Sequence, residues 1–345
     1  RDSLYAMLKR NTFLNIKFEN MLDTLGQMSR TDIYSSLKEW EQLTPLPFYS
    51  IGEPELTKVV NKGGEEFFVL KVLVSNNSDY DGIIQMNVLQ NGWWYQPLED
   101  PRARKKVEIA AHTTKEFVSV WEEQIREVEV NTMISGNLPY MIRQSIGNVK
   151  QERNKIVKDS IYTLPESSLE MPGEIIVDNE DSTLFILSAP PIVGLLPKWL
   201  DEVEETPFKY SGISWWRAPL QWTATTNDRY YGKYIRSAFV IKSGDGSQTA
   251  TWKVPVPEVG QYDLYYHVFK DDELRWNNNL QGEYHFKVKY GSEVEDAYVN
   301  LRKANEGWEQ LGSYYFDSDT VRVVLTDECK LRSVTADAVK IVKRY

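Results

Sequence analysis

Alternation of apolar and polar residues with a period of two is the strongest constraint on the fold of this chain. In residues 320–326, the apolar side chains Val321, Val323 and Leu325 occupy every second position. A strand places successive side chains on opposite faces, so a segment of this kind buries one face of a sheet. Short segments with this pattern recur from about residue 48 onward, and together they predict an all-β chain.

Residues 46–150 are predicted to form a first β-sandwich. Segments 56–61 and 65–76 flank Gly63 and Gly64. A Gly-Gly pair supplies the positive φ angles of a tight turn, so these segments are expected to form a hairpin. About six or seven short antiparallel strands in ~100 residues are typical of an immunoglobulin-like or fibronectin-like sandwich.

Residues 173–345 are predicted to form a second antiparallel β-sandwich. The polar residues 151–172 are interpreted as a linker between the two sandwiches. A long insertion over residues 180–232, rich in Trp and Pro, is expected to be functional or packed as a lid. The strands of the second sandwich are expected at 248–254, 260–269, 283–290, 294–301, 308–316, 320–326 and 334–342.

Residues 1–45 are expected to form a short helical segment. Phe18, Met21 and Leu25 recur at helical spacing, and Gly26 is expected to end this first helix. A second helix is expected to begin near Ser29. Two amphipathic helices cannot bury their apolar faces alone, so the segment is expected to pack on the residues that follow or, in part, on an upstream domain.

Composition excludes several classes of function. The chain has 345 residues, enough for two domains, and its net charge of −10 argues against nucleic acid as a main ligand. A single cysteine excludes an intramolecular disulfide, and three histidines without an H-E-x-x-H motif make a zinc hydrolase site unexpected. The longest weakly polar run, 184–197, is too short to span a bilayer, so direct membrane insertion is not expected.

Six short motifs carry a resemblance to a known family. They are Gly173–Asp178, Tyr230–Arg236, Ala250–Trp252, Gly260–Tyr265, Gly307–Gly312 and Ala336–Val339. Their order and spacing resemble the golvesin C-terminal domain, which also occurs in xanthan lyases. The resemblance covers about half of the chain. It implies a non-catalytic, carbohydrate-binding-module-like β-sandwich that binds or presents carbohydrate-containing surfaces.

A second resemblance runs through Asn131–Pro139, Gly173–Asp181 and Tyr231–Ala238. These segments are similar to the C-terminal region of large Bacteroidetes membrane proteins that join an ABC-transporter-like permease to an M1-type aminopeptidase-like portion. The resemblance implies an extracytoplasmic location and an upstream peptidase-like domain as the partner within a parent chain. The zinc motif of that peptidase family is absent here, so no peptidase activity is implied.

The aromatic content suggests a carbohydrate-binding surface. The chain contains 11 Trp and 20 Tyr, and the C–H faces of sugars pack on aromatic rings while polar groups bind the hydroxyls. The alternative is that these rings hold the long insertion against the core, because Trp is mostly buried wherever it occurs. The candidate residues for carbohydrate are Trp215, Trp216, Trp222, Asp228, Arg229, Tyr230, Tyr231, Trp276 and Asn277.

Four acidic residues are candidate ligands of a structural calcium ion, although no cofactor is expected to be required. Asp178, Glu180 and Asp181 follow the first strand of the second sandwich, and Asp337 lies on its last strand. Terminal strands commonly pair in such sandwiches, and hard carboxylate oxygens suit Ca²⁺. The alternatives are that these carboxylates are solvated, or that Asp337 caps a loop through hydrogen bonds.

The chain is expected not to be an enzyme. Glycoside hydrolysis needs two carboxylates about 5–9 Å apart in a cleft, and no motif marks such a pair. His267 and His285 fall inside alternating strands, and no G-x-S-x-G motif is present. We therefore expect an accessory region that offers a binding face to carbohydrate or a protein partner. The alternatives are a polysaccharide-active enzyme with an unmarked carboxylate pair and a purely structural spacer.

Overall fold

The computed structural model divides the chain into two compact units, Arg1–Leu46 and Pro47–Tyr345. Both units are described only in part. The described residues are 5–7, 9, 17–30, 32, 45–89, 100–147, 149–153, 157–165, 169, 173–188, 209–210, 212–213, 217–270 and 282–344. Almost all of the described secondary structure is strand, which confirms the prediction of an all-β chain with a short helical segment.

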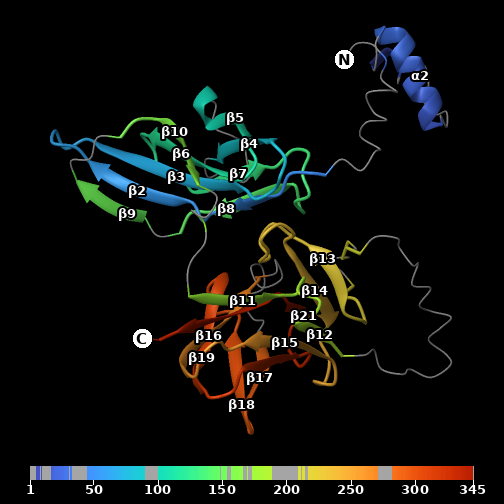
Figure 1. Ribbon diagram of the computed structural model, residues 1–345, viewed down its shortest axis with the longest axis vertical. Coiled ribbons are helices and arrows are strands. Elements are labelled where there is room, and N and C mark those ends of the chain that lie inside the picture. Colours follow the sequence, from blue (N-terminus) through green and yellow to red (C-terminus); the bar gives the residue numbers. More distant parts are fainter. Residues whose placement is uncertain are drawn as a thin grey trace. The chain divides into compact units, whose positions relative to one another are not determined.

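In the first unit, helix α2 spans Phe18–Ser29 (Figure 1). We expected Gly26 to end this helix, but the helix continues past it to Ser29. Arg30 then adopts a left-handed conformation with φ 54°, and its backbone N–H donates to the carbonyl of Gly26. A non-glycine residue thus supplies the end of the helix that we had assigned to glycine. The predicted second helix falls almost entirely outside the described residues.

The second unit begins with two sheets that form the first sandwich. One sheet has the order β10-β6-β3-β2-β9, with β1 also paired to β3, and the other has the order β5-β4-β7-β8. Leu70, Ile84 and Phe117 are fully or almost fully buried between them. The bounds are β1 Tyr49–Ile51, β2 Glu55–Val60, β3 Glu66–Asn76, β4 Gly82–Leu89, the 3-10 helix η1 Pro101–Ala103, β5 Arg104–Ile109, β6 Thr113–Trp121, β7 Glu127–Asn131, β8 Met141–Ser145, β9 Val149–Arg153 and β10 Ser160–Pro165.

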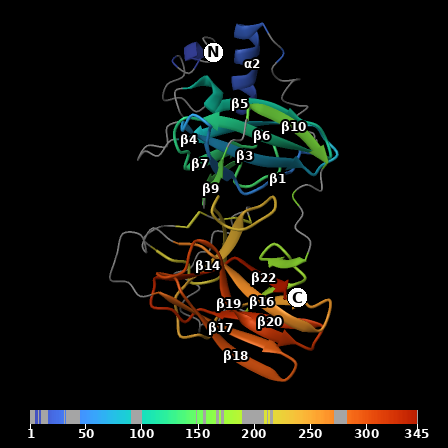
Figure 2. The same cartoon turned by 90° about the vertical axis from the view of Figure 1, so that its left-hand side faces the viewer.

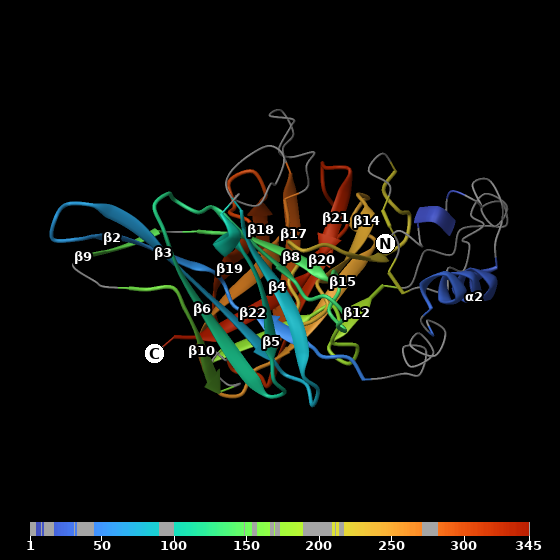
Figure 3. The same ribbon diagram turned by 90° about the horizontal axis from the view of Figure 1, so that it is seen from above.

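The expected Gly-Gly hairpin connects β2 and β3, which lie side by side in Figure 3. Gly64 has φ 83°, a conformation that glycine adopts without a steric penalty. The side-chain oxygen of Asn61 accepts from the backbone N–H groups of Gly63 and Glu65, at 2.8 and 3.0 Å. Turn geometry therefore follows from local sequence, as predicted.

Strand β10 of the first sandwich lies in the segment 151–172 that we interpreted as a linker, and β9 extends into that segment. Strand β10 pairs with β6, and β9 runs parallel to β2, the one parallel pair among the described strands of this sheet. Both are edge strands whose side chains are mostly exposed. Because an edge strand with an exposed surface needs no apolar alternation, its sequence resembles that of a polar linker.

The second sandwich contains a four-stranded sheet, β11-β22-β16-β19, and a five-stranded sheet, β12-β15-β20-β17-β18 (Figure 2). A further three-stranded sheet has the order β13-β14-β21. Trp252, Tyr266 and Phe286 are fully buried in the common core. The bounds are β11 Glu174–Asp178, β12 Phe185–Leu187, β13 Thr223–Thr226, β14 Ser237–Lys242, β15 Thr249–Pro255, β16 Gly260–Val268, β17 Glu283–Tyr290, β18 Glu293–Asn300, β19 Gly307–Phe316, β20 Thr320–Thr326, β21 Ser333–Ala336 and β22 Ala338–Lys343.

The loop between β7 and β8 connects the two sandwiches through buried polar contacts. Asn137, 1% exposed, accepts from the backbone N–H of Tyr49 at 2.9 Å and donates to the carbonyl of Tyr49 at 2.7 Å. The next residue, Leu138, donates its N–H to the carbonyl of Tyr234 and accepts from the N–H of Arg236. Residues 137–138 therefore hold the loop between β13 and β14, which carries several candidate site residues.

Candidate functional site

The predicted carbohydrate residues divide into those that the structure describes and those that it does not. Trp215, Trp216, Trp276 and Asn277 lie outside the described residues. The other five are Trp222, just before β13, and Asp228, Arg229, Tyr230 and Tyr231, in the loop between β13 and β14.

Asp337 anchors this loop through a hydrogen bond from the loop backbone to its buried carboxylate. It lies between β21 and β22, where the chain passes from the three-stranded to the four-stranded sheet, and it is fully buried. Its carboxylate accepts from the backbone N–H of Tyr231 at 3.1 Å and lies 2.8 Å from Nδ1 of His267. Burial raises the pKa of Asp337, while the nearby His267 opposes that shift. The carboxylate therefore acts as a loop anchor, one of the two alternatives left open by the sequence.

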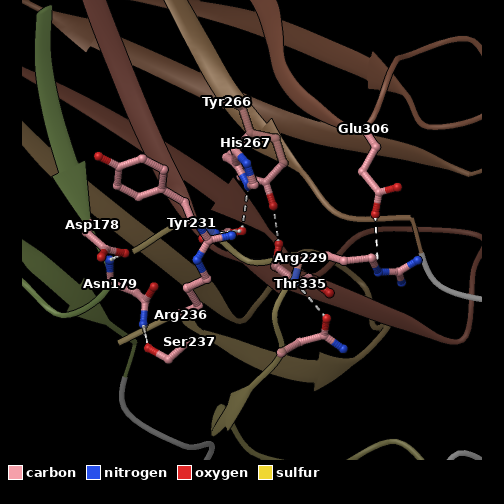
Figure 4. A network of polar contacts seen from close by, with 12 residues as sticks. Asp178, Asn179, Arg229, Tyr231, Arg236, Ser237, Tyr266, His267, Glu306 and Thr335 are labelled. Carbon is pink, nitrogen blue, oxygen red and sulfur yellow. Dashed lines mark hydrogen bonds and ion pairs between the residues drawn. The ribbon is translucent and has the colours of Figure 1, made fainter. Parts of the chain in front are cut away.

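Arg236 and Tyr266 make further contacts in this polar network (Figure 4). Arg236 donates from Nη1 to the carbonyl of Asp228 at 2.8 Å. Its burial lowers the pKa of the guanidinium, and the charges of Asp228 and Asp337 oppose that effect. Tyr266 donates its hydroxyl to the carbonyl of Thr335 at 2.5 Å. Because these groups satisfy one another, the network stabilises the loop without needing a ligand.

Arg229 and Tyr230 also make structural contacts. The Arg229 guanidinium lies 4.5 Å from the ring centre of Phe269, donates to the carbonyl of Lys270 at 2.9 Å and pairs with Glu306 at 3.4 Å. Tyr230 is 5% exposed, and its ring packs edge-on against Phe269. These two side chains therefore fix the loop on the sandwich.

The remaining two side chains differ in their surroundings. Trp222 packs against the core, and its buried indole N–H has no hydrogen-bond partner among the described residues. Asp228 lines a cavity of about 260 Å³ together with Pro139, Met141, Arg143 and Asn227. Among the five described candidates, only Tyr230 is buried, and Asp228 is the one that lines this cavity.

The predicted calcium ligands come close together but are already hydrogen-bonded. Glu180 accepts from Ser237, Tyr210 and Lys209, and Asp181 accepts from the backbone N–H of Asp178 at 2.8 Å. Burial, with a further contribution from Asp337, raises the pKa of Asp178 to about 9. In the part of the chain that is described, no group of three or more His, Cys, Asp or Glu side chains is arranged to hold a metal ion. The calcium site stays a prediction.

A partly exposed aromatic surface lies on the outer face of the four-stranded sheet. The Tyr231 ring packs against Trp308 and His267, at centroid distances of 5.0 and 5.7 Å. Lys340 Nζ lies 4.8 Å from the Trp308 ring and 5.4 Å from the Tyr265 ring. The three rings are partly exposed, whereas Lys340 is buried, with 8% of its surface exposed. We call Tyr231, Tyr265, Trp308 and Lys340 the aromatic surface.

The register of the strands places these side chains on one face. His267 is opposite Trp308, and Tyr265 is opposite Lys340. The alternate residues Leu264, Tyr266 and Val339 are fully buried, so the aromatic surface points away from the core. Polar groups border it, because Glu174 pairs with Lys340 at 3.0 Å and Gln310 is exposed opposite Tyr265. Burial, together with nearby carboxylates, raises the pKa of Tyr231 to about 12, so its hydroxyl stays protonated.

Tyr231 was among the carbohydrate-binding residues predicted from the sequence, but the other three members of this surface were not. Tyr265, Trp308 and Lys340 were placed in strands and given no further role. The missed signal was alternation within 260–268, where outward residues include two ring-bearing side chains, Tyr265 and His267. Pairing of this strand with 307–316, which brings Trp308 beside them, is a long-range contact that periodicity does not reveal.

Part of the chain matches a known protein family. Residues 216–343 match the golvesin C-terminal domain. The match covers β13 to β22 and therefore the whole aromatic surface. It confirms the resemblance over these residues, whereas 173–215 lie outside it. No curated protein matches the chain. The predicted permease and peptidase context is not part of any of these findings.

Two solved structures illustrate the similarity. A xanthan lyase from Paenibacillus is 17% identical, with a TM-score of 0.35, and the alignment covers 88% of this chain and 27% of that one. A β-glucuronidase from Bacteroides uniformis is 10% identical, with a TM-score of 0.23, and covers 92% of this chain and 32% of that one. The chain thus spans less than a third of either protein. At such TM-scores, neither similarity bears on the activity of this chain.

Among the residues that are described, no helix is both long and apolar enough to cross a membrane.

Proposed function

We propose that the chain is a non-catalytic, extracytoplasmic accessory region that binds carbohydrate through the aromatic surface. One observation carries the proposal: Tyr231, Tyr265 and Trp308 are partly exposed on one sheet face, with Lys340 between two of the rings. Pyranose rings pack their C–H faces on aromatic planes, and neighbouring charged and amide groups bind their hydroxyls. Glu174 and Gln310 supply such groups at the border.

The rigid network beneath the surface supports this role. Asp337 fixes the backbone of Tyr231, and His267 packs against both Tyr231 and Trp308. A surface ordered during folding loses little conformational freedom when a ligand binds. An extracytoplasmic location and an upstream peptidase-like neighbour belong to this proposal through the family resemblance alone.

Calorimetric titration with a panel of neutral polysaccharides tests the proposal. Trp308→Ala and Tyr265→Ala are expected to weaken binding at least about tenfold, because a stacked ring contributes roughly 0.5–1.5 kcal/mol beyond its buried area. Tyr162→Ala, which removes an exposed tyrosine from β10, is the matched control and should bind as the wild type.

Two results contradict the proposal. The first is absence of binding to every polysaccharide in the panel by the folded wild-type chain. The second is release of new reducing ends from a polysaccharide, because that result makes the chain an enzyme. Melting temperatures of the variants separate loss of binding from loss of the fold.

A further inference from the structure

Three basic side chains stand in one row across the five-stranded sheet. Lys253 on β15 is directly opposite Arg322 on β20, and Arg322 is directly opposite Lys289 on β17. Lys287 lies two residues from Lys289 on the same strand and face. We call Lys253, Arg322 and Lys289 the basic row.

The basic row points away from the core. The neighbours of these residues along their strands, Trp252, Val254, Val321, Val323 and Val288, are fully buried, and side chains alternate between the faces of a strand. Arg322 and Lys289 are exposed, and Lys253 is partly exposed. The row therefore lies on the opposite sheet from the aromatic surface, with the core between them.

No acidic side chain within the described residues forms an ion pair with this row or with Lys287. Asp296 on β18 is opposite Lys287, but its carboxylate lies 2.7 Å from Nε2 of His285 instead. Glu328 also contacts His285, at 3.2 Å. The acidic groups of this face are thus gathered around His285, whereas the basic row has no counter-charge.

This arrangement costs folding stability. Like charges directly opposite each other on neighbouring strands repel, and here the repulsion is repeated over three strands. The chain as a whole carries a net charge of −10, so acidic residues are abundant elsewhere. A row of unpaired cations in an acidic protein is complementary to an anionic ligand.

We infer that the basic row binds a linear polysaccharide with a carboxylate on each sugar. Neighbouring strands are roughly 4.8 Å apart, a distance comparable to the length of one sugar residue. A polyuronate that crosses the strands therefore carries carboxylates spaced closely enough for the long side chains of the basic row to reach several of them. Lysine and arginine bind carboxylates through charge-assisted hydrogen bonds.

Nucleic acid and anionic membranes are the alternative anionic ligands for this row. A nucleic-acid-binding domain is usually strongly basic, whereas this chain is acidic. The neighbouring row across the same strands contains Thr251, Val324 and Lys287. These alternatives become arms of the test.

Calorimetric titration of the full chain with polygalacturonate at low salt tests the inference. The wild type should bind, and binding should weaken as salt is added, because salt screens exposed charges. Arg322→Gln should weaken binding about threefold, and the triple variant Lys253→Gln, Arg322→Gln, Lys289→Gln about 30-fold, as expected for exposed ion pairs. Lys242→Gln on β14 removes the same charge from another sheet and should bind as the wild type.

Fully methyl-esterified polygalacturonate keeps the sugar backbone but has no charge, so it should not bind to the row. The inference is overturned if the triple variant binds polygalacturonate as tightly as the wild type while remaining folded. It is also overturned if single-stranded DNA or anionic phospholipid vesicles bind the row as tightly as polygalacturonate. Because the aromatic surface lies on the other sheet, Trp308→Ala separates the two proposals: it should leave polyuronate binding by the row unchanged.

Discussion

At the scale of single residues, Asp337 does most to fix the candidate site. It lies where the chain leaves β21 for β22, and it joins His267 of β16 to the backbone of Tyr231. The partly exposed ring of Tyr231 is therefore held by a carboxylate that no ligand can reach. Loss of one partner of a buried carboxylate is costly, because it leaves the remaining buried polar group without its counterpart.

Asp337→Asn should lower the free energy of unfolding by about 3 kcal/mol, because it leaves Arg236 and His267 without their buried anionic partner. Chemical denaturation of wild type and variant measures this loss. Asp319→Asn, an exposed aspartate of the same domain, is the control and should change stability by less than about 0.5 kcal/mol. A loss of similar size in both variants would show that the network is unimportant.

Asp178 predicts a dependence of stability on pH. Its pKa rises from 3.8 to about 9 in the folded chain, so the folded state binds a proton that the unfolded state releases above pH 4. The contribution of protonated Asp178 to folding stability is fully present below its unfolded pKa of 3.8, and it is lost as pH rises toward 9. In EDTA, Asp178→Asn should therefore exceed the wild type in stability by roughly 1–3 kcal/mol at pH 8, with no difference near pH 3.

Calcium supplies the counter-experiment for Asp178. We expect no cofactor to be required, so EDTA should leave the melting temperature of the wild type unchanged. A fall in EDTA that added Ca²⁺ reverses, together with a variant less stable than the wild type, would instead establish the calcium site.

At the scale of elements, strands with alternating buried residues were predictable, including the edge strands β18 and β19, whereas the mostly exposed edge strands β9 and β10 were not. Periodicity located β16, β17 and β20 because their inward residues meet a continuous core. It missed β9 and β10, whose side chains are mostly exposed. The same limit applies to the site: alternation shows which residues share a face of one strand, but not which strand becomes its neighbour. Trp308 was missed for this reason.

The loop between β13 and β14 depends on Gly232. Its φ is 155°, and a Cβ built there would lie 1.9 Å from the carbonyl oxygen of Ile235. Gly232→Ala should therefore destabilise the chain by about 1–3 kcal/mol, since the backbone must move or the loop must open. Gly147→Ala, with nothing within 4 Å of its Cβ, is the control for the melting temperature. An unchanged Gly232→Ala variant would mean that the loop is not held as described.

At the scale of the whole molecule, hydrogen bonds between the two sandwiches connect them within the second unit. Asn137 contacts both Tyr49 in the first sandwich and Tyr234 in the second, and it is almost fully buried. Sequence predicted two sandwiches but not this connection, because it depends on a loop between β7 and β8 that carries no periodic pattern.

Asn137→Ala should partly uncouple the two sandwiches, because it leaves the backbone groups of Tyr49 unsatisfied in a buried place. Scanning calorimetry should show a single transition for the wild type and a broadened or double transition for the variant. Asn305→Ala, exposed in the segment between β18 and β19, is the control. A single transition of unchanged width in the variant would contradict this coupling.

We propose that carbohydrate binds at the aromatic surface and that the chain does not cleave it. The most direct test follows the indole Nε1–H resonance of Trp308, assigned with Trp308→Phe, during titration with an oligosaccharide of the polymer that binds best. We predict that this resonance shifts with saturation and that the oligosaccharide stays intact. No shift at Trp308 while binding proceeds elsewhere, or cleavage of the oligosaccharide, would contradict the claim.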